Sequence, residues 1–215
     1  MRRLAIYLLD FCSLSLPLYI KNRIKIYHLL LIPVSYLVLS ILSLIVGRPL
    51  KDILLIYVNQ SSEYTALTSN APSIYQWFTS KLFSNRALIG NIGIVLTLLV
   101  VFIIFYVSIK YIKIIKYENV IELALLFTTI VPFLLPRMHE RYFFMADVIS
   151  LLYAFCFPRK FHIAIIIPFV SLVCYFPFLY RTSTSFILAA SIVLFIVIID
   201  LLYSFRIHLI NEKNN

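Results

Sequence analysis

Residues 186–199 read Phe-Ile-Leu-Ala-Ala-Ser-Ile-Val-Leu-Phe-Ile-Val-Ile-Ile, an apolar run that contains no charge, no glycine and no proline. The apolar character continues to position 205 and is interrupted by Asp200. A helix that crosses the hydrocarbon core of a bilayer needs about 20 predominantly apolar residues. The segment 186–205 therefore predicts a transmembrane helix, and segments of the same kind precede it along the chain.

The composition of the whole chain agrees with this segment. The 215 residues are 62% hydrophobic and 13% charged, whereas a soluble domain has about 45–50% apolar and about 25% charged residues. So few charges do not cover the surface of a soluble domain of this size. Disordered, collagen-like and disulfide-stabilised small proteins are excluded as well. We expect an all-α, polytopic transmembrane helical bundle.

Seven apolar segments predict about seven spans in a single membrane domain, residues 1–215. The fifth and sixth segments are short, which indicates helices shielded by their neighbours. A long loop, residues 48–87, separates the second span from the third. The expected spans are residues 4–20, 29–47, 88–109, 119–136, 143–157, 163–179 and 186–205.

Lysine and arginine are denser in one set of connections than in the opposite set. Cytoplasmic loops carry the excess of these residues, so the denser set and the C-terminus are expected in the cytoplasm. The loop 48–87 and the N-terminus then lie outside, a placement that Arg2 and Arg3 oppose. Abundant Ile, Lys, Asn and Tyr indicate an AT-rich genome, compatible with a bacterial plasma membrane. The denser set comprises residues 21–28, 110–118, 158–162 and the tail after position 205.

The net charge of +10 does not indicate a nucleic-acid-binding protein, because the basic residues stand in short clusters beside apolar runs. Cys12, Cys156 and Cys174 lie inside apolar runs without metal-site spacing and are expected to be buried free thiols. With three glycines in the chain, glycine-rich nucleotide-binding loops are not expected.

The densest cluster of titratable side chains is a short turn between two apolar runs, formed by Arg137, His139, Glu140 and Arg141. One interpretation is a plain loop whose arginines reach the lipid headgroups. The other is a site for an anionic phosphate, which guanidinium groups bind through paired hydrogen bonds. A histidine there donates a hydrogen bond to the phosphate or shuttles a proton near neutral pH. Position 143 is Phe, so the zinc motif H-E-x-x-H is absent and no metal is expected at this turn.

A second informative stretch lies in the long external loop and reads Ser69-Asn-Ala-Pro-Ser-Ile-Tyr-Gln-Trp-Phe78. Tyr75 and Trp77 stand close together in it. Such rings form a belt at the headgroup level of a membrane. Alternatively, they form a lid over a site and stack on sugar faces or lipid tails. The sequence leaves both interpretations open.

Two motifs carry a resemblance to a known family. Leu135-Pro-Arg-Met-His-Glu-Arg-Tyr-Phe-Phe144 resembles the P-x-M-H-E-R-Y motif of bacterial membrane glycosyltransferases, which are relatives of the GPI-anchor mannosyltransferases and have the GT-C architecture. Asn70-Ala-Pro-Ser-Ile-Tyr-Gln-Trp77 resembles the N-x-P-x-x-Y-x-W pattern of their long external loop. The order and separation of the two motifs are similar to those of the family, with the chain corresponding to the C-terminal half of such an enzyme.

The resemblance implies transfer of a sugar, such as the hexose mannose, from a polyprenyl-phosphate donor on the extracytoplasmic face. It implies that His139, Glu140 and Arg141 lie at the donor phosphate with Arg137 close by. It also implies that Asn70, Tyr75 and Trp77 belong to the substrate loop.

The chain departs from the family pattern at the acidic loop that supplies a general base or holds a metal. No external acidic pair is present, and the weak substitutes are Asp10 and Glu63. We therefore expect a C-terminal, donor-binding piece: either the reading frame is truncated or split, or an N-terminal partner chain supplies the front half. A divalent cation, if one is used, would be held by that missing loop.

Two alternatives remain beside the glycosyltransferase. One is a transporter or flippase for lipid-linked sugars, which needs polar residues along several spans. The spans are expected to be nearly free of charge apart from Asp10 and Asp200. The other is a non-catalytic remnant or assembly subunit that contacts membrane lipid and lacks the catalytic loop.

Overall fold

The computed structural model describes residues 26–49, 51, 53, 66–78, 85–111, 117–180 and 185–214. The chain divides into two compact units, Met1–Tyr64 and Thr65–Asn215, which are treated separately here. The described residues are mostly helical, and the only strands among them are two residues long.

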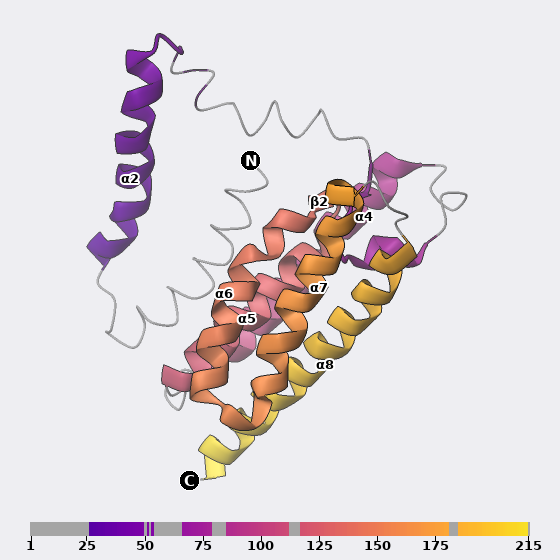
Figure 1. Cartoon of the computed structure of the whole chain (residues 1–215). Coiled ribbons are helices and arrows are strands. Elements are labelled where there is room, and N and C mark those ends of the chain that lie inside the picture. Colours follow the sequence, from indigo (N-terminus) through magenta and orange to yellow (C-terminus); the bar gives the residue numbers. More distant parts are fainter. Residues whose placement is uncertain are drawn as a thin grey trace. The chain divides into compact units, whose positions relative to one another are not determined.

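The first unit contains helix α2, Ile26–Ile45 (Figure 1). The helix ends where Gly47 adopts a positive φ of 89°, a conformation that glycine reaches without steric cost. The amide of Gly47 donates to the Leu44 carbonyl at 2.9 Å, and the amide of Arg48 donates to the Ser43 carbonyl at 3.1 Å. These two hydrogen bonds form a Schellman motif, which satisfies the last carbonyls of the helix.

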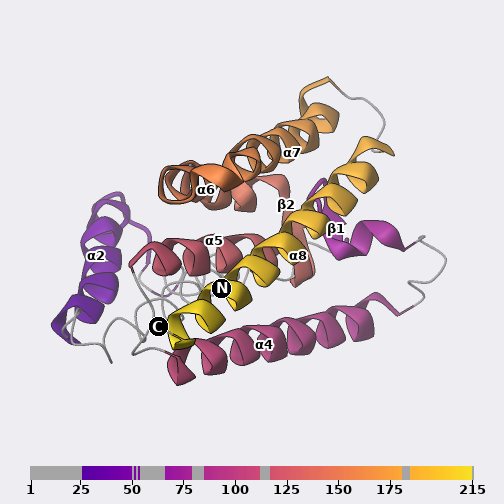
Figure 2. The ribbon, with the colours of Figure 1, turned by 90° about the horizontal axis from the view of Figure 1, so that it is seen from below.

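The described residues of the second unit form a bundle of five helices, α4 to α8, which run alternately in opposite directions (Figures 1 and 2). Helix α5 packs against α4, α6 and α8, and α7 packs against α6 and α8. Most side chains of α5 are buried, and Leu125 and Phe127 are fully buried, so this helix forms the centre of the core. The helices are α4 (Arg86–Lys110), α5 (Tyr117–Leu134), α6 (Phe144–Cys156), α7 (Phe161–Tyr180) and α8 (Ser185–Asn214).

The two ends of this bundle differ in their short elements. One end, called the motif end below, carries strand β1 (Thr68–Ser69), strand β2 (Met138–His139) and the 3-10 helices η1 (Ile74–Trp77) and η3 (Glu140–Phe143). The opposite end, called the basic end, is where α4 and α8 finish and where the 3-10 helix η4 (Pro158–Lys160) connects α6 to α7. Its basic residues in the described part of the chain include Lys110, Arg159, Lys160 and Arg206.

Three helices among the described residues are long and apolar enough to cross a membrane: Arg86–Lys110, Pro158–Tyr180 and Ser185–Asn211. Their outward faces are rich in large apolar side chains such as Phe102 and Phe169, both more than 60% exposed. A soluble protein does not present apolar surface of this extent to water, and lipid covers it in a membrane. The bundle has the surface of an integral membrane protein.

The expectation of about seven spans is wrong for the described residues, although most of the expected segments are helical. Segment 4–20 lies outside the described residues. Helix α6 has 13 residues, so it is about 20 Å long and is shorter than the bilayer core of about 30 Å. The apolar run of α5 is interrupted near its start by Glu118 and Glu122, and its side chains face other helices rather than lipid.

The prediction of buried free thiols holds in part. Cys174 is a fully buried free cysteine, and Cys156 is a free cysteine that is half-buried. Cys12 lies outside the described residues. The side chain of Cys174 in α7 is packed in the protein interior, as a small apolar side chain would be.

Candidate functional site

The structure joins the two motif regions of the sequence through backbone hydrogen bonds. Strands β1 and β2 pair in parallel, with Thr68 opposite Met138 and Ser69 opposite His139. The amide of Arg137 also donates to the Leu67 carbonyl at 2.5 Å. Asn70 forms a further bridge with His139. Segments about 70 positions apart in the sequence therefore form one small site at the motif end.

The turn between α5 and β2 is set by a proline and a left-handed residue. The amide of Leu135 still donates to the Val131 carbonyl, and Pro136 then has no amide to continue the helical pattern. Arg137 follows with φ of 62°. A positive φ is rare for a residue with a long side chain and costs about 1–2 kcal/mol. The packing of the turn against β1 holds this conformation in place, and such strain is concentrated at functional sites.

The four charged residues of the turn differ in exposure. The side chains of His139 and Glu140 are 13% and 11% exposed, and His139 Nδ1 lies 4.0 Å from Glu140 Oε2. The side chain of Arg141 is exposed, and Arg137 is half-buried. The side chains of His139 and Glu140 are thus mostly buried, whereas the side chain of Arg141 in the same turn is exposed. A histidine that is protonated on contact with an anion would form an ion pair with this carboxylate.

Helices α6 and α7 add groups that the sequence analysis did not single out. Asp147 lies in the first turn of α6, and its Oδ1 is buried without a hydrogen-bond partner. Ser171 of α7 is close to this carboxyl group. Tyr175 of α7 lies in the electrostatic field of Glu140, Asp147 and Arg141. Asp147 was overlooked because it lies inside the apolar segment 143–157. The available signal was its spacing of seven residues from Glu140, which is two helical turns.

Tyr75 connects residues 66–78, called the loop segment, to the end of α5. Its hydroxyl donates to the Leu134 carbonyl at 2.9 Å, and burial raises the pKa of Tyr75 to about 12. The ring lies on Gly93 of α4: a Cβ at this glycine would be 1.8 Å from the Tyr75 hydroxyl oxygen. Gly93 is therefore required for the position of Tyr75, a role that the sequence analysis did not identify.

Trp77 anchors the end of the same segment. Its indole nitrogen donates to Ser191 Oγ of α8 at 2.8 Å. The indole also meets the rings of Phe133 and Phe195 edge-on, with centroids 6.1 and 5.0 Å away. Trp77 is 36% exposed, so part of the indole remains accessible. The tryptophan fixes the loop segment to α5 and α8 while it keeps one face open.

Of the remaining sequence candidates, Asn70 belongs to this site through its bridge with His139. Asp10 and Glu63 lie outside the described residues. Asn70 is half-buried and has φ of 55°, a left-handed conformation that asparagine tolerates well. Among the described residues, no group of three His, Cys, Asp or Glu side chains is arranged to hold a metal ion.

These features define a class: a helical membrane protein with a polar site at one end of the bundle, formed by a loop segment and a charged turn. Comparison of the chain with models of known protein families, with curated proteins and with solved structures gives no match. The function therefore has to be inferred from the chemistry of the site.

Proposed function

We propose that this chain is the donor-binding part of a membrane glycosyltransferase that takes a sugar, such as mannose, from a polyprenyl-phosphate donor. The observation that carries the proposal is the pairing of β1 with β2, which joins the Asn70–Trp77 pattern to the His139 turn. Both patterns resemble parts of one enzyme family in the sequence. Their contact in space is what a shared substrate site requires.

The charges of the turn suit the departing group of such a reaction. Transfer breaks the bond between the sugar carbon and the phosphate oxygen, and negative charge develops on the lipid phosphate that leaves. Cations and hydrogen-bond donors fixed beside that phosphate lower the barrier. Arg137, His139 and Arg141 supply them from one turn, and Glu140 orients the neighbouring imidazole.

The reaction also needs a group that takes the proton of the acceptor hydroxyl as the new glycosidic bond forms. Among the described residues of the motif end, Glu140 already faces His139, whereas Asp147 has a carboxylate oxygen without a hydrogen-bond partner. We assign the role of base to Asp147 within this proposal. A partner chain with an acidic loop would supply the base if Asp147 serves only to position Tyr175 or Ser171.

The test is sugar transfer in membranes that contain the complete enzyme, with labelled polyprenyl-phosphate mannose and glucose as donors. Replacing His139 or Arg141 with Ala is expected to abolish transfer while the protein still inserts into the membrane. Arg86→Gln is the matched control, because Arg86 is an exposed cation at the motif end outside the turn. Transfer that is unchanged in both turn variants contradicts the proposal, and retained transfer in Asp147→Asn excludes Asp147 as the base.

One observation favours a second candidate, a transporter of lipid-linked sugars. The interior of the bundle is less free of ionisable groups than expected, because Glu122 of α5 is fully buried. His208 Nδ1 of α8 lies 2.8 Å from Glu122 Oε2, and the Tyr153 hydroxyl of α6 donates to Oε1 at 3.2 Å. Buried ionisable groups in membrane bundles mark ion or substrate paths. Flux of labelled lipid in proteoliposomes that Glu122→Gln abolishes would favour transport over transfer.

A further inference from the structure

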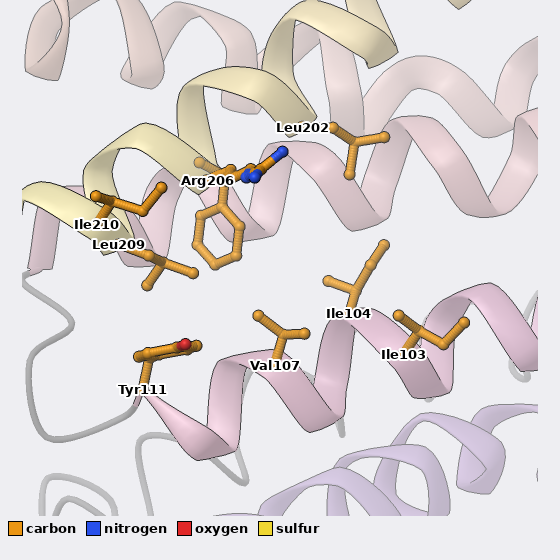
Figure 3. A pocket seen from close by; sticks show the side chains of 9 residues that line it. Ile103, Ile104, Val107, Tyr111, Leu202, Arg206, Leu209 and Ile210 are labelled. Atoms are coloured by element: carbon orange, nitrogen blue, oxygen red, sulfur yellow. The ribbon is translucent and has the colours of Figure 1, made fainter. Parts of the chain in front are cut away.

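A groove lies at the basic end, along the last turns of α4 and α8 (Figure 3). It exists because α4 and α8 both pack against α5 and leave space between themselves. The cavity volume is about 570 Å³, which falls in the range of about 300–1,000 Å³ typical of small-molecule sites. The groove is separate from the charged turn, which lies between α5 and α6 at the other end of the bundle.

The walls of the groove are aliphatic. Ile104 and Val107 line it from α4, and Leu202 and Leu209 line it from α8 (Figure 3). Ile103 at its edge is exposed, so the groove opens to the outside of the bundle. Both helices are among those apolar enough to cross a membrane, so the outside here is lipid. A hydrocarbon chain is the ligand that matches such walls.

One charged side chain interrupts this apolar lining. Arg206 lies in the middle of the α8 wall and is exposed. In the described part of the chain, no carboxylate lies within ion-pair distance of its guanidinium group. A second cation is close, because Lys110 Nζ lies 5.8 Å from the ring centre of Tyr111, which closes the groove. The groove therefore combines apolar walls with uncompensated positive charge.

We propose that this groove binds an anionic phospholipid, with one acyl chain between α4 and α8 and the phosphate at Arg206 and Lys110. Basic pockets between transmembrane helices bind anionic headgroups in this way. A guanidinium group satisfies two phosphate oxygens at once, and long cationic side chains reach from an apolar helix to the headgroup level. The charge complementarity selects an anionic lipid over a zwitterionic or neutral one.

The test is a lipid titration of the full-length protein in detergent, followed by native mass spectrometry. Phosphatidylglycerol and phosphatidylcholine with identical acyl chains are the two probes. We expect the wild type to bind one phosphatidylglycerol in preference to phosphatidylcholine. Arg206→Gln is expected to weaken phosphatidylglycerol binding about tenfold, the effect of losing one strong charge-assisted contact, and to leave phosphatidylcholine binding unchanged.

Two further variants separate the groove from general electrostatics. Arg159→Gln removes an exposed arginine of the basic end that does not line the groove, and it is expected to leave binding unchanged. Val107→Trp fills the groove and is expected to weaken binding of both lipids. Equal losses in the Arg206 and Arg159 variants overturn the proposal, as does an absence of preference between the two lipids. A cross-link from the Val107→Cys variant to residues 1–64 or to a second copy, in place of lipid, also overturns it.

Discussion

At the motif end, two segments distant in sequence are joined mainly through the backbone, by the pairing of β1 with β2 and by the amide of Arg137. At the basic end, side chains connect the helices instead: Lys160 Nζ lies 2.5 Å from Asp200 Oδ1, and His208 lies 2.8 Å from Glu122. The first arrangement fixes the backbone of the charged turn against the loop segment. The second pairs ionisable side chains of different helices with one another. The comparison indicates that backbone pairing fixes the position of the charged turn at the motif end, whereas side-chain pairs link the helices at the basic end.

The largest loss of stability is expected at Glu122, where ionisable side chains are paired inside the bundle. Glu122→Ala leaves the His208 imidazole and the Tyr153 hydroxyl without their shared acceptor, and the loss of one partner of a buried pair costs about 3 kcal/mol. Thermal unfolding in detergent measures this. Glu118→Ala is the control, because Glu118 is exposed on the same helix and a surface change costs at most about 0.5 kcal/mol. Equal shifts in the two variants would show that the cluster at Glu122 does not stabilise the bundle.

A smaller loss of stability is expected when a substitution on α4 displaces the ring of Tyr75. Gly93→Ala places a Cβ 1.8 Å from the Tyr75 hydroxyl oxygen and 3.4 Å from Pro136, so the ring has to move. Such overpacking costs about 1–3 kcal/mol. Gly90→Ala is the matched control on the same helix, because its Cβ would be 3.8 Å from Leu67, an ordinary contact. That variant is expected to gain as much as about 1 kcal/mol from the better helix propensity of alanine. Stabilisation by both substitutions would contradict the placement of Tyr75.

Alkaline pH tests the burial of the Tyr75 phenol without changing the shape of any side chain. The phenol of Tyr75 has a pKa of about 12 when folded, whereas it ionises near its ordinary value of 10 when unfolded. Between these values the unfolded state loses the proton first, so the folded state becomes less stable as the pH rises. The difference in stability between wild type and Tyr75→Phe is expected to shrink from pH 10 to pH 12. A difference that stays constant over this range would show that the phenol is not buried.

The smallest loss of stability is expected at Trp77. Trp77→Phe removes the hydrogen bond to Ser191 Oγ and costs about 1 kcal/mol, and Ser191→Ala is expected to cost a similar amount. In the double variant the two losses are not additive, because both remove the same bond. Unfolding measurements on the two single variants and the double variant give this coupling. Additive losses would contradict the bond.

The sequence predicted the helices well because their apolar runs are long. The run 88–109 corresponds to α4, and the run 163–179 corresponds to α7, each extended by a few residues at its ends. The number of spans was overestimated because apolar runs such as α6 are shielded by other helices and are too short to cross a membrane alone.

The site was only partly predictable. The charged turn was identified from its composition, but its pairing with residues 68–69 was not predicted, because strands of two residues leave no periodic pattern. Asp147 and Glu122 were missed because a single carboxylate inside an apolar run is easily included in a span. Whether such a group is buried, and what it contacts, is decided by the neighbouring helices. The role of Gly93 depends likewise on a ring that lies 18 positions earlier in the chain.

The central claim is that the motif end binds the phosphate of a polyprenyl donor. A polyprenyl phosphate with a photoreactive group beside the phosphate tests it directly, when cross-linked to the full-length protein in membranes and mapped by peptide mass spectrometry. We predict labelled peptides from residues 66–78 and 135–144, and loss of this labelling in an Arg137→Gln, Arg141→Gln double variant. Labelling confined to the ends of α4 and α8, or equal labelling by a neutral polyprenol, would contradict the claim.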